Sequence, residues 1–207
     1  MTRTEIIEDG ITDYPQSLQR QKHLWKKRHR GLINDTIILC QHYPVISLGL
    51  RKSANILTAD KSTLEQKKIP VIQSNRAGGI TAHNPGQLVI YLIMDINKRK
   101  LDINSFVKKT EEAGIYLLSR MGLNASRKEG FPGVWAAGKK IASIGLRISR
   151  GISYHGMAVN INNDLEIFNS IIPCGTAGTV ISSAAEETHL DYTIEDAMEI
   201  FRELQWD

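Results

Sequence analysis

Cys174 is the residue of this sequence whose setting best suits nucleophilic chemistry. It lies in the stretch Ile-Ile-Pro-Cys-Gly-Thr-Ala-Gly, a loop between a helical pattern and a run of small residues. A substrate can reach a thiol in such a loop, and the thiolate form is the nucleophile. The spacing alone supports a functional and a structural role for Cys174 equally. Cys40 lies instead in an apolar run typical of a buried strand, so we expect it to be an inert core residue.

Lys140 is a second candidate because it opens a stretch of apolar and small residues with the pattern of a strand. Neighbouring side chains of a strand point to opposite faces, so Lys139 and Lys140 would face in opposite directions. One lysine can then be solvated while the other faces a pocket. The alternative is that both are exposed charges at the end of a strand, which is the commoner fate of lysine.

A glycine-rich stretch covers residues 76–87, with the sequence Arg-Ala-Gly-Gly-Ile-Thr-Ala-His-Asn-Pro-Gly-Gln. Glycines at this density let the backbone approach a ligand closely, and Thr81 and His83 add polar groups beside it. The same composition also fits a hairpin loop with an incidental histidine. A further stretch, Tyr-His-Gly-Met-Ala-Val-Asn at 154–160, again combines a histidine with small residues.

The elements that must position these residues are partly segregated into helical and strand-rich regions. Helical patterns predict helices at 13–31, 58–67, 104–121, 164–170 and 193–205, the first with Asp13 as its cap and Gly31 at its end. Strand-like composition predicts strands at 36–42, 45–48, 69–74, 87–96, 133–135, 139–148 and 152–161. This order predicts an α+β fold, with a mixed or antiparallel sheet flanked by helices, and not a doubly wound parallel sheet.

Length and composition are those of an ordinary globular protein. The 207 residues predict a single domain over 1–207, with 42% hydrophobic and 23% charged residues. No apolar run approaches the roughly 18 residues of a membrane span, and the first residues lack the apolar segment of a signal peptide. Two cysteines do not make a disulfide scaffold, so a reducing, cytoplasmic location is expected.

Basic residues crowd the end of the first predicted helix, although the net charge is only +4. This cluster is either a solvated helix face or a landing patch for an acidic partner. Nucleic acid is not expected as a partner, because the segment lacks the stacking aromatics of single-strand binders. The cluster consists of Lys22, Lys26, Lys27, Arg28 and Arg30.

The ordered set of these motifs resembles the octanoyltransferase family of lipoate biosynthesis. In that family, Arg-Gly-Gly-x-x-Thr-x-His-x-Pro-Gly-Gln is followed by Gly-Val-Trp, Lys-Ile-Ala-x-Ile-Gly, His-Gly and Pro-Cys-Gly. Each has a counterpart here, in the same order, and the resemblance extends from about residue 10 to 190. Ala77 and Asn84 stand where the family has glycine, and Ser182-Ser183 replaces Thr-Ser. None of these departures removes a group that does chemistry.

The resemblance implies a single catalytic acyltransferase domain with a fold like that of biotin and lipoate protein ligases. It assigns Cys174 as the nucleophile that carries octanoyl as a thioester. Lys140 then stabilises the thiolate and, once neutral, accepts a proton from the attacking amine. The implied substrate-binding residues are Arg76, Ala77, Gly78, Gly79, Ile80, Thr81, Ala82, His83, Ser143, Ile144, Gly145, Gly156, Met157 and Ala158, with His83 as a pocket-lining group rather than a base.

The implied donor is octanoyl-acyl carrier protein, and the implied acceptors are lipoyl domains of 2-oxoacid dehydrogenases and the glycine-cleavage carrier protein. No cofactor or metal is expected, because the donor thioester is already activated, and no membrane partner is expected. The sequence contains no Walker loop and no clustered metal ligands. Three alternatives remain: an ATP-dependent lipoate or biotin ligase, which needs no cysteine, a non-catalytic carrier-binding homologue and a thiol hydrolase.

Overall fold

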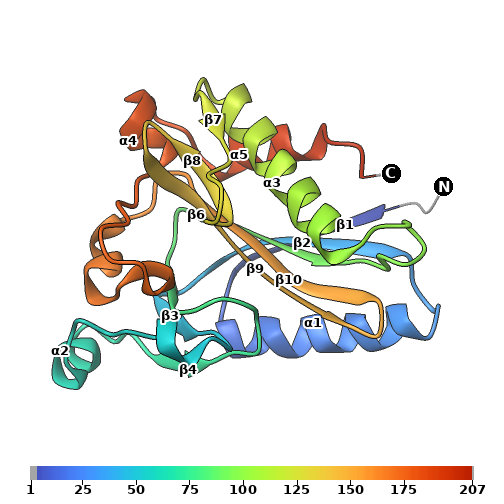
Figure 1. Ribbon diagram of the computed structural model, residues 1–207, viewed down its shortest axis with the longest axis horizontal. Coiled ribbons are helices and arrows are strands. Elements are labelled where there is room, and N and C mark those ends of the chain that lie inside the picture. Colours follow the sequence, from blue (N-terminus) through green and yellow to red (C-terminus); the bar gives the residue numbers. More distant parts are fainter. Residues whose placement is uncertain (1–3, 207) are drawn as a thin grey trace.

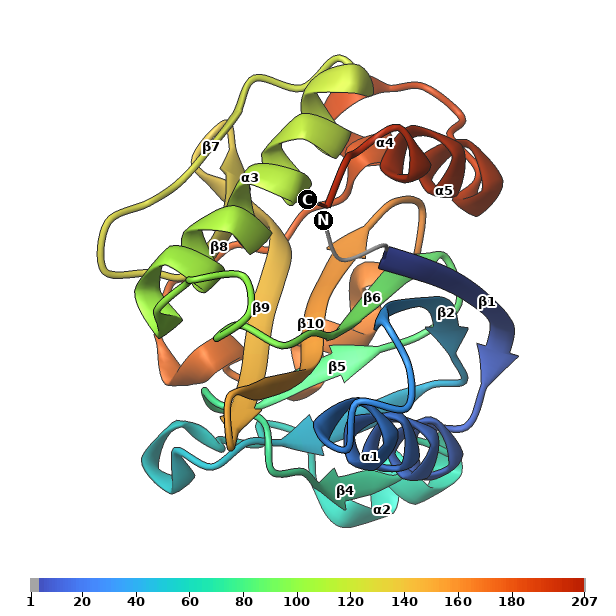
Figure 2. The ribbon, with the colours of Figure 1, turned by 90° about the vertical axis from the view of Figure 1, so that its right-hand side faces the viewer.

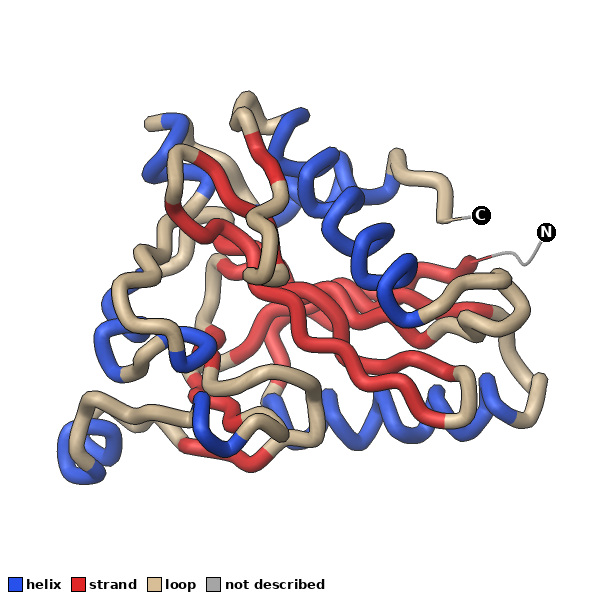
Figure 3. The backbone as a smooth tube through the Cα atoms, in the orientation of Figure 1, coloured by secondary structure: helices blue, strands red, loops and turns tan. Residues whose placement is uncertain are grey.

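The computed structural model describes residues 4–206, so the first three residues, which form part of the start considered above, and residue 207 lie outside it. A mixed sheet of seven strands forms its centre, in the order β1-β2-β6-β10-β9-β8-β7 (Figures 1 and 3). β1 and β2 pair in parallel, and the other neighbours pair antiparallel, which confirms the predicted α+β fold. The strands are β1 (Thr4–Thr12), β2 (Asp35–His42), β6 (Gln87–Ile93), β7 (Ala125–Ser126), β8 (Gly133–Ala136), β9 (Lys139–Ser149) and β10 (Ile152–Asn160).

A smaller sheet of three strands, in the order β4-β3-β5, carries the end of the glycine-rich stretch. Its strands are β3 (Val45–Leu48), β4 (Val71–Gln73) and β5 (Thr81–His83). The α-helices are α1 (Tyr14–His29), α2 (Lys61–Gln66), α3 (Ile103–Arg120), α4 (Ala184–Thr188) and α5 (Ile194–Arg202), and the short 3-10 helices are η1 (Lys52–Ala54), η2 (Leu165–Ser170) and η3 (Pro173–Gly175). Within residues 4–206, no helix is long and apolar enough to cross a membrane.

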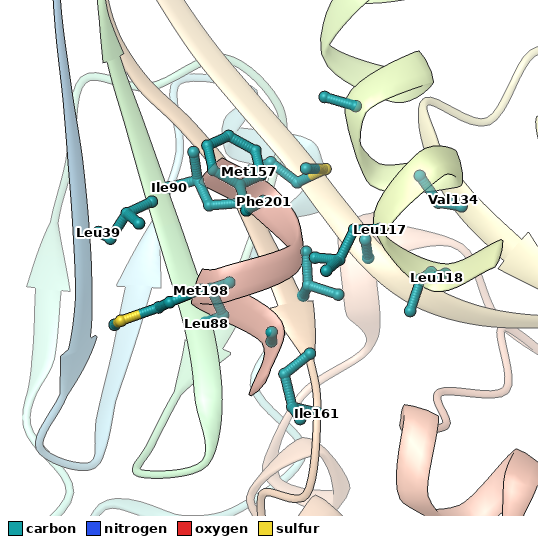
Figure 4. Close-up of a cluster of buried hydrophobic side chains, with 14 of the residues drawn as sticks. Leu39, Leu88, Ile90, Leu117, Leu118, Val134, Met157, Ile161, Met198 and Phe201 are labelled. Atoms are coloured by element: carbon teal, nitrogen blue, oxygen red, sulfur yellow. The ribbon is translucent and has the colours of Figure 1, made fainter. Parts of the chain in front are cut away.

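Helices cover both faces of the large sheet, with α3 and α5 on one side and α1 on the other (Figure 2). The central strand β6 is fully buried because its alternate side chains enter two different cores. Leu88 and Ile90 join the larger core, where they pack with Leu117 of α3 and Phe201 of α5 (Figure 4). Tyr91 joins the smaller core under α1. Of the predicted substrate-binding residues on β10, Ala158 belongs to the smaller core on the α1 side, whereas Met157 belongs to the larger core.

The strand β1 was not predicted from the sequence. It pairs in parallel with β2 along the whole of its length, with a bulge between Glu8 and Gly10. As an edge strand it exposes much of its surface. Its sequence therefore contains acidic residues, and apolar and polar residues do not alternate regularly as they do in a half-buried strand. The bulge shifts the alternation of faces by one residue, which removes the remaining periodic signal.

The predicted basic cluster at the end of α1 was wrong in one member, because Arg28 is buried. Its guanidinium is buried and lies 2.6 Å from Oδ1 of Asp35, and Arg99 contacts Oδ2 of the same carboxylate at 2.6 Å. Arg28 therefore supports the fold by fixing α1 to the start of β2, and it is not part of an exposed patch. The exposed members of the cluster are Lys22, Lys26, Lys27 and Arg30.

Candidate active site

Cys174 lies at the centre of η3 in the left-handed region, with φ of 55°. A non-glycine residue there is strained by roughly 1–3 kcal/mol, and such residues cluster at functional sites. Two hydrogen bonds hold its backbone: the N–H of Cys174 donates to the carbonyl of Ile80 at 3.2 Å, and Arg51 donates to the carbonyl of Cys174 at 2.6 Å. Gly175 passes so close to η1 that a Cβ would lie 2.5 Å from Cα of Ala54. The cysteine loop is thus anchored to the glycine-rich stretch and to η1.

The side chain of Lys140 points at this cysteine. Its Nζ lies 3.5 Å from Sγ of Cys174, and the residue is only 4% exposed. The backbone of Lys140 is fixed by the segment that follows the cysteine: its N–H donates to Val180 at 2.9 Å, and its carbonyl accepts from Ser182 at 3.1 Å. The start of β9 and the end of the cysteine loop therefore move as one unit, which keeps the ammonium and the thiol together.

Lys139 faces the other way, as the strand alternation predicted. Its Nζ forms an ion pair with Glu187 at 2.7 Å on the outside of the sheet. The hydrogen bond that Nζ donates to Glu187 raises the pKa of Lys139, so this lysine stays a surface cation. Lys140 has no carboxylate within ion-pair distance among residues 4–206, and it lies 5.6 Å from the ring centre of Trp135. Only one of the two adjacent lysines is therefore placed beside the thiol.

Gly133 provides the space that the Lys140 side chain occupies. A Cβ at position 133 would lie 2.6 Å from Cε of Lys140 and 2.4 Å from the carbonyl of Ala142. The N–H of Gly133 donates to the buried carboxylate of Glu111 at 3.1 Å, which holds β8 in this position. The glycine of the Gly-Val-Trp motif is thus required by the lysine of the next motif.

An inner pocket lies on one side of Cys174, between the glycine-rich stretch, β9, β10 and α1. Glycines form part of its walls: a Cβ at Gly145 would lie 3.1 Å from Cδ of Arg76, and one at Gly156 would lie 2.0 Å from the carbonyl of Ile90. Among the predicted substrate-binding residues, the lining includes Arg76, Gly78, Gly79, Thr81, His83, Ser143, Ile144, Gly145, Gly156, Met157 and Ala158.

Three residues predicted to bind the acyl group do not line this pocket. Ile80 and Ala82 are buried in a separate apolar core around α2 and η2, because they lie on the opposite face of the strand from Thr81 and His83. Ala77 contributes a backbone contact to the structure instead: its N–H donates to the carbonyl of Leu146 at 2.9 Å. Ile80 still serves the site, but through the carbonyl that receives the N–H of Cys174.

Four further pocket residues were missed from the sequence: Tyr14, Val89, Tyr91 and His155. Tyr14 begins α1, far from the motifs in the chain. Val89 and Tyr91 lie in a continuous apolar run whose two faces cannot be told apart by periodicity alone. His155 stands within the predicted His-Gly motif, but only its neighbours on the glycine side were named.

Two buried histidines, His83 in the inner pocket and His42 next to it, are uncharged near neutral pH. Burial lowers the pKa of His83 to about 3, despite a hydrogen bond with Gln87 at 2.7 Å, and that of His42 to about 4. The ring of His83 stacks on Tyr14 with a 5.7 Å centroid distance, and His42 bonds to the Tyr91 hydroxyl at 2.7 Å. His83 thus lines the inner pocket and forms no hydrogen bond with the Cys174 thiol.

Arg76 is the cation of the inner pocket. Its guanidinium donates to the carbonyl of Ser47 at 2.7 Å and to the Ser47 hydroxyl at 2.9 Å, and it reaches the carbonyl of Ala77 at 3.3 Å. Burial lowers the pKa of Arg76. Its bonds join β3 to the glycine-rich stretch, so this arginine shapes the wall that faces Cys174.

An outer pocket of about 320 Å³ lies on the solvent side of Cys174. It shares Gly78, Ile144 and Cys174 with the inner pocket, so the thiol stands at the junction of the two. The remaining lining residues are Arg51, Gly130, Phe131, Pro132, Trp135, Lys140, Thr176 and Thr179. This arrangement lets the thiol meet a chain buried on one side and a protein-borne group approaching from the other.

The fold agrees with the comparison with known protein families. The chain matches the model of the lipoyl protein ligase A/B catalytic domain over residues 13–204. An octanoyltransferase from Desulfovibrio desulfuricans is 38% identical, over 86% of this chain and 75% of the relative. Another, from Maridesulfovibrio salexigens, is 34% identical over 96% and 93%. The chain belongs to the lipoyl protein ligase A/B family and, within it, to the octanoyltransferases. It is therefore an acyltransferase, as the resemblance in its motifs implied.

Solved structures confirm, at low sequence identity, the predicted similarity to the fold of lipoate and biotin protein ligases. A bipartite lipoate protein ligase from Thermoplasma acidophilum matches with a TM-score of 0.75 and 15% identity, over 98% of this chain and 82% of the other. A biotin protein ligase from Aquifex aeolicus matches with a TM-score of 0.51 and 11% identity, over 98% and 67%. Among residues 4–206, no group of three or more histidine, cysteine or acidic side chains is placed to hold a metal ion.

Proposed function

We propose that this octanoyltransferase carries the octanoyl group on Cys174 as a thioester, between a donor acyl carrier protein and an acceptor lysine. The observation that supports this most directly is the 3.5 Å contact between Nζ of Lys140 and Sγ of Cys174, at the junction of two pockets. A cysteine thioester is close in energy to the donor thioester, so neither ATP nor another activating cofactor is needed.

In the first half-reaction, the thiolate of Cys174 attacks the carbonyl carbon of the donor thioester. The bond to the carrier sulfur breaks, the acyl group stays on Cys174, and the carrier thiolate leaves. Lys140, as an ammonium, stabilises the attacking thiolate and can give its proton to the leaving sulfur. The enzyme then holds a neutral acyl-thioester beside a neutral lysine.

In the second half-reaction, the amine of the acceptor lysine attacks the Cys174 thioester. The new amide nitrogen loses one proton, which neutral Lys140 accepts, and the thiolate of Cys174 is released. The ammonium and thiolate of the resting pair are thereby restored. The acceptor lysine first loses its ammonium proton to solvent. With the acceptor as a neutral amine, the two half-reactions balance in charge and protons, which gives Lys140 one function in each.

The acyl chain is placed in the inner pocket. Val89, Met157 and Ala158 provide apolar surface, and His83 and Tyr91 add uncharged polar groups. The guanidinium of Arg76 also lines this pocket, where it donates to Ser47. A saturated chain makes no hydrogen bonds with water that it would have to give up on binding. Burial of each methylene stabilises the complex by roughly 0.8 kcal/mol. The inner pocket encloses only about 40 Å³ in this structure. We therefore propose that it widens to hold the eight-carbon chain while the thioester carbonyl stays at Cys174.

The acceptors in this proposal are lysines of lipoyl domains and of the glycine-cleavage carrier protein, and the enzyme works in the cytoplasm. We also propose that residues 1–207 act as one catalytic domain. The competing reading is an ATP-dependent ligase, because a lipoate protein ligase A bound with ATP shares the fold with a TM-score of 0.72 at 15% identity. Cys174 beside Lys140 supports the transferase, since an acyl-adenylate needs no thiol.

Intact-mass measurement tests the proposal. Wild-type protein mixed with octanoyl-acyl carrier protein, without ATP or magnesium, should gain one octanoyl group that hydroxylamine removes. Cys174→Ala should gain none and transfer none, whereas Cys40→Ala, which alters only the buried thiol, should still be acylated. Transfer by Cys174→Ala at the wild-type rate would disprove the thioester intermediate. A strict requirement for ATP and free octanoate would place the protein with the ligases.

A further inference from the structure

The outer pocket bears cations without carboxylate partners. Within residues 4–206, neither Lys140 nor Lys128 has an acidic group at ion-pair distance, although Lys139 and Arg127, immediately beside them in sequence, are both paired. Arg51 is likewise unpaired in this part of the chain and uses one nitrogen on the carbonyl of Cys174, which leaves other N–H donors of its guanidinium. The solvent side of the thiol is therefore a positively charged entrance whose charges are not neutralised by the described residues.

Lys128 has a defined position in this entrance. Its Nζ lies 4.5 Å from the ring centre of Trp135 and 5.0 Å from that of Phe131, and both rings line the outer pocket. Cation–π contact of this kind holds an ammonium over a ring without neutralising it. Lys128 is thus an exposed cation that aromatic surface keeps beside the pocket and that remains able to bind an anion.

The spacing between Lys128 and the thiol has an upper limit. The Trp135 ring contacts Nζ of Lys128 at 4.5 Å and Nζ of Lys140 at 5.6 Å, and the latter lies 3.5 Å from Sγ of Cys174. Lys128 and the thiol are therefore at most about 14 Å apart. A pantetheine arm has about thirteen bonds between sulfur and phosphorus, which span up to roughly 16 Å at about 1.2 Å per bond.

We propose that the outer pocket binds the pantetheine arm of the acyl donor and that Lys128 binds the phosphodiester at its far end. This rests on the proposed function, because the thioester end of the arm must reach Cys174. The arm is uncharged between its ends, which suits a pocket of about 320 Å³ with Phe131 and Trp135 in its wall. Its single anionic group then meets the unpaired ammonium of Lys128.

The acceptor lysine is a poorer fit for these charges. Its amine enters as a cation, so Arg51 and Lys128 repel it, whereas they attract the phosphodiester of the donor. The basic end of α1 is also a poorer site for the arm. Figure 1 shows that α1 runs away from the orange segment that carries η3, and its last residues lie about 24 Å along the helix axis from Tyr14 at the inner pocket.

The test compares two protein-free donors, octanoyl-phosphopantetheine and octanoyl-pantetheine, by the second-order rate of Cys174 acylation. Wild type should prefer the phosphorylated donor about fivefold, as expected for an exposed charge pair of about 1 kcal/mol. Lys128→Met keeps the apolar stem over the rings and should abolish the preference, whereas Lys128→Arg should retain it. Lys27→Met, a control at the basic end of α1, should leave it unchanged.

The outcomes separate this inference from the proposed function. If wild type reacts equally with both donors, or Lys128→Met keeps the preference, Lys128 does not bind the phosphate. If neither small donor reacts although octanoyl-acyl carrier protein does, the pocket does not recognise the arm, and the inference is wrong. If octanoyl-acyl carrier protein also fails to acylate Cys174, the proposed function itself is wrong.

Discussion

Gly133 and Lys140 are matched in shape across two adjacent strands. The glycine on β8 has no side chain where the lysine on β9 passes, and the contact would be 2.6 Å if a Cβ were present. Lys140 depends on this gap to reach Cys174, because its own backbone is fixed by hydrogen bonds to the end of the cysteine loop. The position of the Lys140 amino group is therefore decided as much by an absent side chain as by the lysine itself.

Gly133→Ala should displace the Lys140 side chain or shift β8. We expect octanoyl transfer to fall at least tenfold and the free energy of unfolding to drop by about 1–3 kcal/mol, as for other overpacked sites. Gly138→Ala is the matched control, because Gly138 also has positive φ but a Cβ there would meet nothing within 4 Å. The control should lose some stability in denaturant titrations and keep its transfer rate. Equal losses of transfer in both variants would contradict the packing argument.

Substitutions of Lys140 separate its two functions. Lys140→Ala should slow alkylation of Cys174 by iodoacetamide near neutral pH, because the thiolate loses its cation. Lys140→Arg keeps the charge but cannot accept a proton from the acceptor amine, since arginine is not deprotonated in proteins. This variant should acylate itself and then stop, as single-turnover transfer assays can show. Lys139→Arg, on the outer face, should change neither the alkylation rate nor the transfer rate. Normal alkylation and normal transfer by both Lys140 variants would show that Lys140 is not part of the active site.

The buried histidines predict how stability depends on pH. Burial lowers the pKa of His83 and of His155 to about 3, and that of His42 to about 4. Between these values and the unfolded value near 6.5, the unfolded chain binds more protons than the folded protein, so stability falls as the pH falls. Each histidine can contribute up to about 2 kcal/mol of loss between pH 7 and pH 5.

The measurement is the melting temperature of wild type from pH 7.5 to pH 5, compared with two variants. His83→Gln removes one buried titrating group and should flatten the pH dependence. His23→Gln alters an exposed histidine of α1 and should follow the wild-type curve. Parallel curves for wild type and His83→Gln would show that His83 does not resist protonation in the folded state.

Charge reversal at the end of α1 tests the landing patch suggested by the sequence. Lys26, Lys27 and Arg30 are exposed, but they lie at the end of α1 farthest from Tyr14. We therefore expect the triple reversal to change the KM for octanoyl-acyl carrier protein and its salt dependence less than Lys128→Met does. A larger rise in KM, with a flattened salt response, would instead place the docking surface of the carrier on α1.

Most of the fold follows from local patterns. The strands β2, β3, β6, β9 and β10 and the helices α1, α3 and α5 lie where apolar periodicity and cap residues predicted them. The strand β1 did not, because an exposed edge with a bulge has no buried face to leave a pattern. Arg28 was misassigned for a related reason: a charged residue in a basic run looks solvated until tertiary structure brings Asp35 beside it.

The site was predictable where a motif contains its own chemistry. Cys174 and Lys140, which the fold brings within 3.5 Å of each other, and the glycines of the inner pocket all stand in such motifs. Tyr14 and Tyr91 were not, because the fold brings them to the pocket from a helix start and a fully buried strand, where no local signal distinguishes them. Ile80 was named for the wrong reason, since its side chain faces a core while its carbonyl holds the cysteine loop.

The position of Cys174 between the two pockets has a kinetic consequence. In the proposed reaction, acyl donor and acceptor both approach Cys174 through the outer pocket on the solvent side of the thiol. They must therefore take turns, and a carrier protein that has given up its acyl group still competes with the acceptor for the entrance. The ratio of free to octanoyl-loaded carrier protein would then set the rate of protein modification. This would couple the rate of the enzyme to the supply of fatty-acid intermediates without a separate regulatory site.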